Sequence, residues 1–156
     1  IFLGSCGGLG GSKIGDIILP RRAYDGEGFS RYYKDEDGLN LRKENFIATN
    51  QCLLKKAAGI FEESGISYKS GDIFTIGSLF AERNELLEVL QRNDFIGIEL
   101  ELSSFFTAVE FLKIESLAML YVEDLPLSEP FLNPDKNLKQ SVNKIIELSL
   151  KLIGTN

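Results

Sequence analysis

Acidic residues close two apolar stretches of the chain that are predicted to be strands. Glu99 and Glu101 end the first stretch, and Glu123 and Asp124 end the second. In an open α/β sheet, a ligand binds in the crevice beyond the carboxyl ends of the strands. We therefore expect two neighbouring strands to direct Glu101 and Asp124 into one cleft.

Carboxylates in such a cleft suit two tasks that need no histidine. One carboxylate accepts hydrogen bonds from a pair of sugar hydroxyls, and another, when partly desolvated, keeps a proton and gives it to a leaving group. Loss of a heterocyclic base from ribose requires both tasks, because positive charge develops on the sugar and negative charge on the base. The alternative is that strand-end acids cap neighbouring helices or lie in water.

The composition argues against several other functions. The 156 residues include no histidine, which excludes Ser-His-Asp and Cys-His catalysis and most zinc chemistry. We predict no metal site and no cofactor. A net charge of -6 argues against nucleic acid or an anionic membrane as a partner. Because the sequence has no signal peptide and no membrane-spanning apolar run, we expect a cytoplasmic protein. We expect Cys6 and Cys52 to be reduced, buried and structural.

Strands and helices alternate along the chain, which is typical of an α/β protein with a three-layer α/β/α arrangement around a central mixed sheet. We expect residues 1–156 to form a single domain. Thr49 or Asn50 can cap a helix that Gly65 ends. The predicted strands cover residues 1–3, 13–20, 66–75, 95–101 and 116–122, and the predicted helices cover residues 50–64, 82–92, 102–112 and 133–152.

Glycines and a proline mark the expected turns. Residues 4–11 are predicted to form a glycine-rich turn, but Lys13 stands where a dinucleotide-binding fingerprint needs its third glycine. Pro20 is expected to stop its strand, and residues 21–41 are expected to form a long loop.

The loop of residues 75–80 joins a strand to a helix at the same sheet edge as the acidic strand ends. Its Leu79 and Phe80 are candidates to wall a pocket for a base. The alternative is that an aromatic residue at this place belongs to the core, as is more common.

Four motifs, in order, resemble those of the purine nucleoside phosphorylase and uridine phosphorylase superfamily. The first two are Gly-Ser-Cys-Gly-Gly-Leu at residues 4–9 and Ile-Gly-Asp with its apolar continuation at residues 14–20. Ile-Glu-Leu-Glu at residues 98–101 is similar to the family's Val-Glu-Met-Glu strand end. Val-Glu-Asp at residues 122–124 is similar to the Val-Ser-Asp strand end of the purine-specific branches. The resemblance covers nearly the whole chain and implies a nucleoside phosphorylase-like fold.

The resemblance also implies a role for each acid. Glu101 would accept hydrogen bonds from the ribose 2′ and 3′ hydroxyls, with Glu99 and Leu100 as further substrate-binding residues. Asp124 would be the catalytic acid, donating a proton toward N7 of a departing purine.

The same resemblance implies roles for two further groups of residues. Ser5 and the backbone of Gly4 would bind inorganic phosphate as the co-substrate. Thr75, Leu79 and Phe80 would hold the base.

Three positions depart from the family's pattern. Phe2 stands where the phosphorylases usually have an arginine, and a phenyl ring cannot replace the paired hydrogen bonds of a guanidinium to phosphate. Leu79 stands where many relatives have a stacking phenylalanine. Glu123 replaces a serine, and a second carboxylate beside Asp124 is expected to raise the pKa of that acid.

We predict a pentosyltransferase that cleaves the N-glycosidic bond of a purine nucleoside with phosphate, as in purine salvage. Hydrolysis by water and a catalytically weak nucleoside-binding protein are the alternatives. The resemblance implies a homo-oligomer, with residues 21–33 as the expected contact, and it implies further strands upstream of Ile1.

Overall fold

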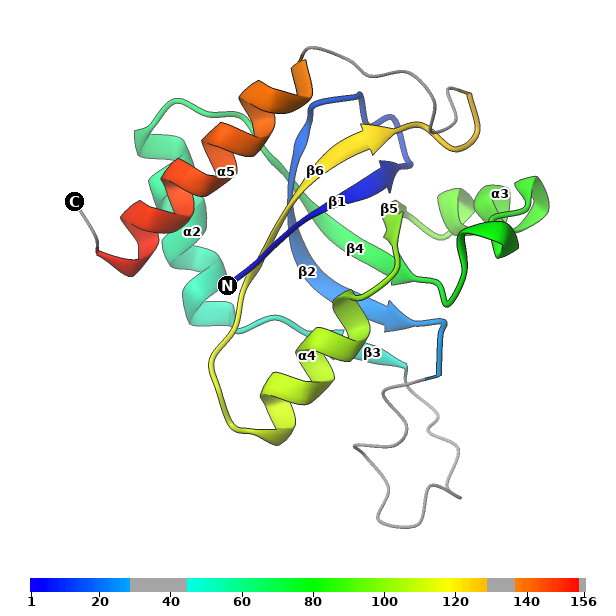
Figure 1. Cartoon of the computed structure of the whole chain (residues 1–156), viewed down its shortest axis with the longest axis horizontal. Helices are drawn as coiled ribbons and strands as arrows, with labels where there is room; N and C mark the ends of the chain where they lie inside the picture. Colours follow the sequence, from blue (N-terminus) through cyan, green and yellow to red (C-terminus); the bar gives the residue numbers. More distant parts are fainter. Residues whose placement is uncertain (29–44, 129–136, 155–156) are drawn as a thin grey trace.

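A six-stranded mixed sheet forms the centre of the molecule (Figure 1). The computed structural model describes residues 1–28, 45–128 and 137–154. The strands are β1 (Phe2–Gly8), β2 (Ile17–Asp25), β3 (Phe46–Ala48), β4 (Lys69–Thr75), β5 (Phe95–Glu99) and β6 (Ala118–Asp124), and their order in the sheet is β3-β2-β4-β5-β1-β6. The pairs β2–β4, β4–β5 and β1–β6 are parallel, whereas β2–β3 and β1–β5 are antiparallel. The expected α/β class with a mixed sheet is confirmed.

The sheet closes on itself, which the sequence analysis did not predict. The start of β2 pairs with β6, with Ile17 opposite Tyr121 and Ile18 opposite Leu120. Because β2 also pairs with β4, the strands β2, β4, β5, β1 and β6 form a continuous ring. The expectation of an open sheet was therefore wrong.

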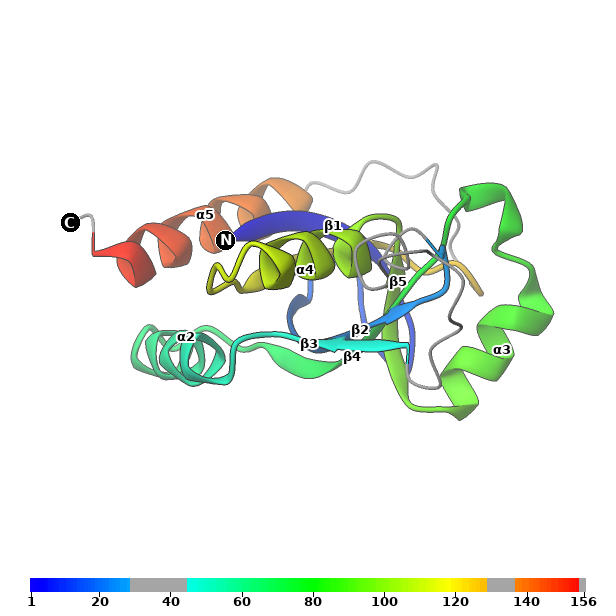
Figure 2. The ribbon, with the colours of Figure 1, turned by 90° about the horizontal axis from the view of Figure 1, so that it is seen from below.

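Helices cover the sheet on two sides and at one end. Helix α4 (Leu102–Phe111) packs on β2 and β3, and helices α2 (Gln51–Glu63) and α5 (Asn137–Ile153) pack on each other and on β2 and β6, respectively. Helix α3 (Asn84–Arg92) follows the short 3-10 helix η1 (Leu79–Ala81) and lies at the end of the molecule away from α2 and α5 (Figure 2). Buried apolar residues fill each of these contacts.

Local sequence signals explain the boundaries of helix α2. The side chain of Asn50 accepts a hydrogen bond from the backbone N–H of Leu53 at 2.9 Å, which satisfies one of the free donors of the first turn. Ala57 and Phe61 are spaced by one helical turn and are fully buried. Gly65 adopts a left-handed φ of 65° just after the helix, as expected for a glycine that ends one.

The glycine-rich segment was predicted wrongly. Residues 4–8 belong to β1, and the turn comes later, where Gly10 and Gly11 have φ values of 58° and 77°. Pairing with β5 on one side and β6 on the other holds the glycines extended. Ile1 and Leu3 were expected to be buried, but they are 44% and 38% exposed.

Pro20 does not stop its strand. Strand β2 continues to Asp25, and its register with β4 shifts between Pro20 and Arg22. This irregularity accommodates a residue that has no N–H to donate. Residues 21–25 are therefore strand and not loop, and residues 29–44 lie outside the described part of the chain. The predicted start of the last helix, Asn133, also lies outside it.

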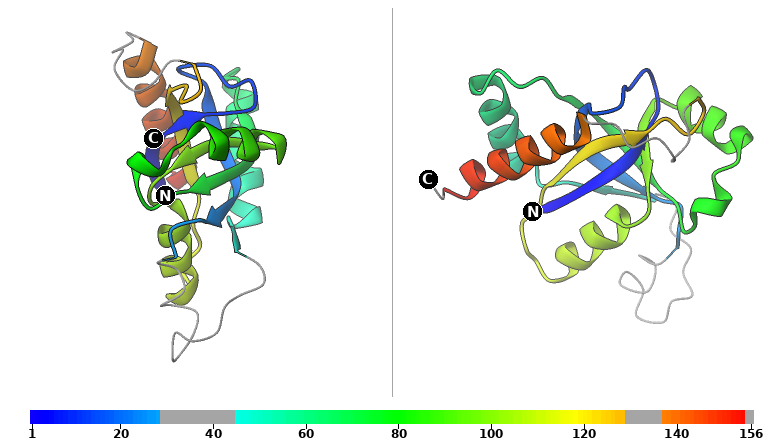
Figure 3. Two further views of the ribbon diagram at one scale, coloured as in Figure 1. Left: turned by 90° about the vertical axis from the view of Figure 1, so that its right-hand side faces the viewer. Right: turned by 45° about the horizontal axis from the view of Figure 1, so that its top comes forward.

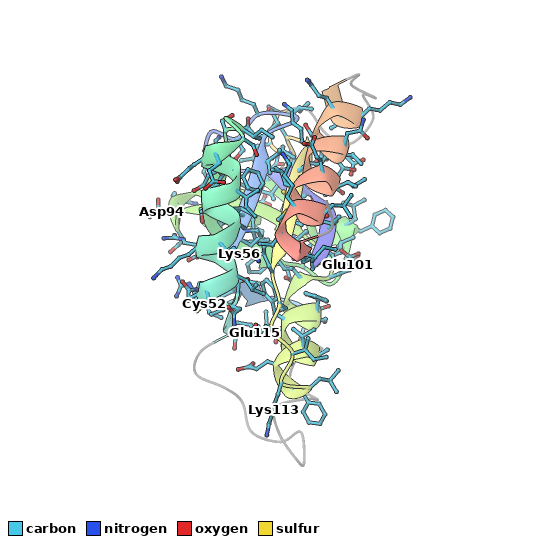
Figure 4. The ribbon with its side chains drawn as sticks, turned by 90° about the vertical axis from the view of Figure 1, so that its left-hand side faces the viewer. Cys52, Lys56, Asp94, Glu101, Lys113 and Glu115 are labelled. Carbon is cyan, nitrogen blue, oxygen red and sulfur yellow. The ribbon has the colours of Figure 1, made fainter. Side chains whose placement is uncertain are left out.

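The two cysteines differ in their surroundings. Cys6 is buried in β1, as predicted. Cys52 is exposed on helix α2, so the prediction that it is buried was wrong (Figure 4). Within the described residues, no helix combines the length and the apolar character needed to cross a membrane.

Candidate active site

The two acidic strand ends meet at Gly7 of β1. Gly7 lies opposite Ile98 of β5 in an antiparallel pair and opposite Asp124 of β6 in a parallel pair. Strand β1 therefore separates β5 from β6, and these two strands run in opposite directions (Figure 3). The expectation that they are neighbours was wrong. Their ends still meet, because β5 pairs with β1 only through its last residues.

A pocket opens between these strand ends and helix η1. It contains about 500 Å³ of empty space, part of it open to solvent. Glu101 and Asp124 both line it, so the prediction that they share one hollow is confirmed. The complete lining consists of Ser5, Cys6, Gly7, Leu79, Glu82, Ile98, Glu99, Leu100, Glu101, Glu123 and Asp124.

Glu99 uses its carboxylate to hold the first turn of α4. Its Oε2 accepts hydrogen bonds from the backbone N–H groups of Glu101 and Leu102, at 2.7 and 2.6 Å. Its Oε1 accepts a hydrogen bond from the hydroxyl of Thr75. Glu99 is only 5% exposed, and this burial raises its pKa to about 7 although the hydrogen bonds oppose the shift. Glu99 therefore lines the pocket while both of its oxygens are bound to protein.

Thr75 lies behind the pocket instead of in its wall. Its side chain is fully buried, donates to Glu99 and accepts a hydrogen bond from the backbone N–H of Ser103 at 3.0 Å. The structure does not bring it to the space where a base would bind. Its contacts instead join the end of β4 to the first turn of α4.

Glu101 differs from Glu99 in exposure and in contacts. It occupies the position just before the first turn of α4, with an exposed side chain that makes no capping hydrogen bond (Figure 4). The alternative interpretation of the acids as helix caps is therefore correct for Glu99 and not for Glu101. The carboxylate of Glu101 can face a ligand.

Asp124 has a close neighbour that must be glycine. A Cβ atom added to Gly7 would lie 3.1 Å from Oδ1 of Asp124 and 2.6 Å from Cγ of Pro126. The second distance is shorter than any ordinary contact between carbon atoms. Gly7 therefore lets the end of β6 approach β1 and fixes the place of Asp124 in the pocket.

Glu82 is a pocket residue that the sequence analysis missed as a site candidate. It follows η1 and is half-buried in the pocket lining. Burial and, secondarily, the charge of Asp124 raise the pKa of Glu82 to about 7. The sequence did offer one signal that Glu82 could line the site, because it lies two residues after Phe80, near the loop at the acidic edge of the sheet. We had predicted it only as the first residue of a helix.

The floor of the pocket comes from β1. Ser5 lies opposite Tyr121 in the parallel pair, and both residues are partly buried. Burial, together with the nearby acids, raises the pKa of the Cys6 thiol, which is therefore neutral and forms an apolar wall. Gly4 is not part of the lining, because it lies opposite Leu120 in the middle of the strand pair and away from the strand ends.

The two candidates for a base wall have different positions. Leu79 lines the pocket. Phe80 is 97% exposed on η1 and does not line it, because the short helix directs its ring into solvent. The expectation that Phe80 contributes to the pocket is not met within this chain.

The sequence matches known proteins over nearly its full length. The profile of the phosphorylase superfamily matches residues 1–154. DeoD-type purine nucleoside phosphorylases from Buchnera aphidicola and Jannaschia sp. are 24% and 28% identical, over 98% and 97% of this chain. The chain covers 63% and 62% of those two proteins, so it spans less than two thirds of their length.

Solved structures have the same fold. The 5′-methylthioadenosine/S-adenosyl homocysteine nucleosidase of Campylobacter jejuni superposes with a TM-score of 0.80 at 18% identity, covering 99% of this chain and 68% of that one. The AMP nucleosidase of Bacteroides thetaiotaomicron gives a TM-score of 0.74 at 22% identity, covering 99% and 63%. The resemblance found in the four sequence motifs is thereby confirmed, and the chain belongs to the phosphorylase superfamily.

Proposed function

We propose that this protein cleaves the N-glycosidic bond of a purine nucleoside, with inorganic phosphate as the second substrate. The observation that carries the proposal is that Glu101 and Asp124 line one pocket. Family membership supports the type of reaction, and the similarity to purine nucleoside phosphorylases supports the purine and the phosphate.

Each acid has one task in the proposed reaction. Glu101 accepts hydrogen bonds from the ribose hydroxyls, and Leu100 contacts the sugar. The bond between C1′ and N9 breaks, and its electron pair moves into the purine ring. Asp124 donates a proton to N7, which neutralises the departing base. An oxygen of phosphate forms the new bond to C1′, and Asp124 regains its proton from solvent.

Glu99 and Thr75 position the sugar-binding acid in this proposal. Their hydrogen bonds fix the first turn of α4, from which Glu101 projects. Because the backbone of Glu101 is already fixed, less conformational entropy is lost when the substrate binds.

Water is a second candidate for the attacking group. Five carboxyl groups line the pocket, and those that are ionised repel a phosphate anion. Phe2, in the position of the family's arginine, packs its ring 5.2 Å from the ring of Phe105 and offers no positive charge. Both observations lower the expected affinity for phosphate, and they are the reason to keep hydrolysis as the second candidate.

Phosphate dependence decides between the two reactions. We expect the release of hypoxanthine from inosine to increase with added phosphate, and ribose 1-phosphate to appear in the ³¹P NMR spectrum. Equal rates with and without phosphate, with free ribose as the sugar product, would assign hydrolysis instead. Asp124→Asn protein serves as the control for a contaminating enzyme, because contaminant activity would survive the substitution.

A further inference from the structure

A carboxyl group outside the pocket binds the first turn of helix α4. Glu27 lies just beyond the end of β2, and its Oε1 accepts hydrogen bonds from the hydroxyl groups of Ser103, at 2.8 Å, and of Ser104. These serines are the second and third residues of α4. Glu27 is partly buried and does not line the pocket. Its contacts are therefore with the helix that leads away from Glu101.

The loop that carries Glu27 is held against the end of β4. The backbone N–H of Gly26 donates to the carbonyl oxygen of Thr75 at 2.9 Å. A Cβ atom added to Gly26 would lie only 2.6 Å from that oxygen, so glycine is needed for this close approach. Oδ1 of the buried Asp25 accepts a hydrogen bond from the N–H of Gly28 at 2.7 Å. Glu27 therefore presents its carboxylate from a fixed backbone.

Glu101 depends on the first turn of α4 for its orientation. It precedes the first residue of the helix, and its own side chain makes no capping hydrogen bond. Glu99 binds the backbone N–H groups of Glu101 and Leu102, and Glu27 binds the side chains of the next two residues. Carboxylates at this end of a helix are also stabilised by the helix dipole. Two acids from separate strands therefore fix the turn that carries Glu101.

We propose that Glu27 is a positioning residue, which holds Glu101 in place for the ribose hydroxyls through its hydrogen bonds to Ser103 and Ser104. The inference rests on the proposed function, in which Glu101 accepts hydrogen bonds from those hydroxyls. It adds to the site a residue that none of the four sequence motifs contains.

The test compares inosine with 2′,3′-dideoxyinosine, which lacks both hydroxyls that Glu101 binds. We expect Glu27→Ala to lower kcat/KM for inosine by about tenfold, since a small displacement of a substrate-positioning group is costly. The value for 2′,3′-dideoxyinosine should stay close to that of the wild-type protein. Equal losses with the two nucleosides in folded Glu27→Ala protein would overturn the inference.

A double-mutant cycle shows whether Glu27 acts through Glu101. In Glu101→Ala protein, the further change Glu27→Ala should have no effect on kcat/KM for inosine. Two independent residues would instead give additive losses. Additive losses would show that Glu27 acts apart from Glu101, which contradicts the inference.

Three further variants control the comparison. Glu27→Gln keeps an oxygen that can accept from both serines, so it should keep the wild-type ratio of the two kcat/KM values. Glu63→Ala is an exposed change on α2 and should also keep this ratio. If circular dichroism shows that Glu27→Ala protein does not fold, Ser104→Ala removes one of the two hydrogen bonds and should lower the ratio of inosine to dideoxyinosine. An unchanged ratio in folded Ser104→Ala protein would then overturn the inference.

Failure of the proposed function gives a different result. In that case the wild-type protein releases no base from inosine, and calorimetry of the binding of both nucleosides replaces the kinetic test. Weaker binding of inosine to Glu27→Ala protein, with unchanged binding of 2′,3′-dideoxyinosine, would support the role of Glu27. Equal changes for both nucleosides, or no binding of either to the wild-type protein, would overturn it.

Discussion

Two glutamates in one motif have different roles because their surroundings differ. Glu99 is buried, with both carboxylate oxygens bound to Thr75 and the first turn of α4, whereas Glu101 is exposed at the pocket. Only the second carboxylate can bind a sugar without first giving up protein contacts. The motif therefore combines one positioning acid with one ligand-facing acid.

The raised pKa of Glu99 predicts a specific dependence of stability on pH. Its pKa is about 7 in the folded protein, against the ordinary value of 4.5 for a glutamate, so between these values the folded state holds a proton that the unfolded state has released. The free energy of unfolding should therefore decrease as the pH rises through this range. The contribution of Glu99 between about pH 5 and about pH 8 is about 2 to 3 kcal/mol.

Glu99→Gln isolates this contribution. The amide can accept from the α4 backbone and donate to Thr75, so we expect the variant to fold and to lose that part of the pH dependence. Urea unfolding of the wild-type and variant proteins at both pH values measures it. Glu63→Gln, an exposed change on α2, should keep the wild-type dependence. Identical pH profiles for wild-type and Glu99→Gln protein would contradict the assigned burial effect.

Sequence patterns could predict that Glu101 and Asp124 are site residues, but they could not predict the other residues that line the pocket. Acids at strand ends stand out in the sequence, and a family motif singles out Glu101 and Asp124. Glu82 has no such signal, because only the turn of η1 brings it to the pocket. The sequence likewise contains no signal that Cys52, the second residue of helix α2, is exposed to solvent.

At the scale of elements, the glycines of β1 let three strand ends come together. A methyl group at Gly7 would overlap Pro126 and press on Asp124. We expect Gly7→Ala to displace the end of β6 and reduce base release by about tenfold or more, since a displacement of about 1 Å at a catalytic group can cost a hundredfold. Steady-state kinetics and thermal unfolding of the variant measure the effect.

Gly59→Ala is the matched control for this substitution. Gly59 lies inside helix α2, and a Cβ atom there would meet no atom within 4 Å. Because alanine favours a helix over glycine, Gly59→Ala should stabilise the protein by about 0.5 to 1 kcal/mol and leave activity unchanged. Full activity of Gly7→Ala protein would show that the approach of β6 to β1 does not matter for the site.

The predictability of the elements depends on how local their signals are. Helix α2 was predicted within a few residues, because Asn50, Gly65 and the apolar spacing between them are local signals. Strands β1 and β2 were not, because glycine and Pro20 indicate turns when read alone. Pairing on both sides of these strands overrides that local preference.

At the scale of the whole molecule, ring closure places the pocket. Pairing of β2 with both β4 and β6 bends the sheet, so that β5 and β6 bring their ends together although they run in opposite directions. An open sheet with β5 and β6 as neighbours would also bring the two acids together, but the pocket instead depends on the closed ring. Long-range pairing such as Ile17 with Tyr121 leaves no local trace in a sequence, which explains the missed closure.

The central claim is that Glu101 and Asp124 act on one nucleoside in one pocket. The most direct measurement determines kcat, KM and equilibrium affinity for a purine nucleoside in wild-type, Asp124→Asn and Glu101→Ala proteins. Asp94→Asn is the control, since Asp94 is exposed and asparagine tolerates its φ of 61° (Figure 4).

We predict that Asp124→Asn lowers kcat by about a hundredfold to ten-thousandfold with little change in affinity, as expected for loss of a general acid. Glu101→Ala should lower affinity and turnover together, because its hydrogen bonds to the sugar form in the ground state and in the transition state. A wild-type protein that binds the nucleoside without releasing the base, with neither property altered by Asp124→Asn, would contradict the claim.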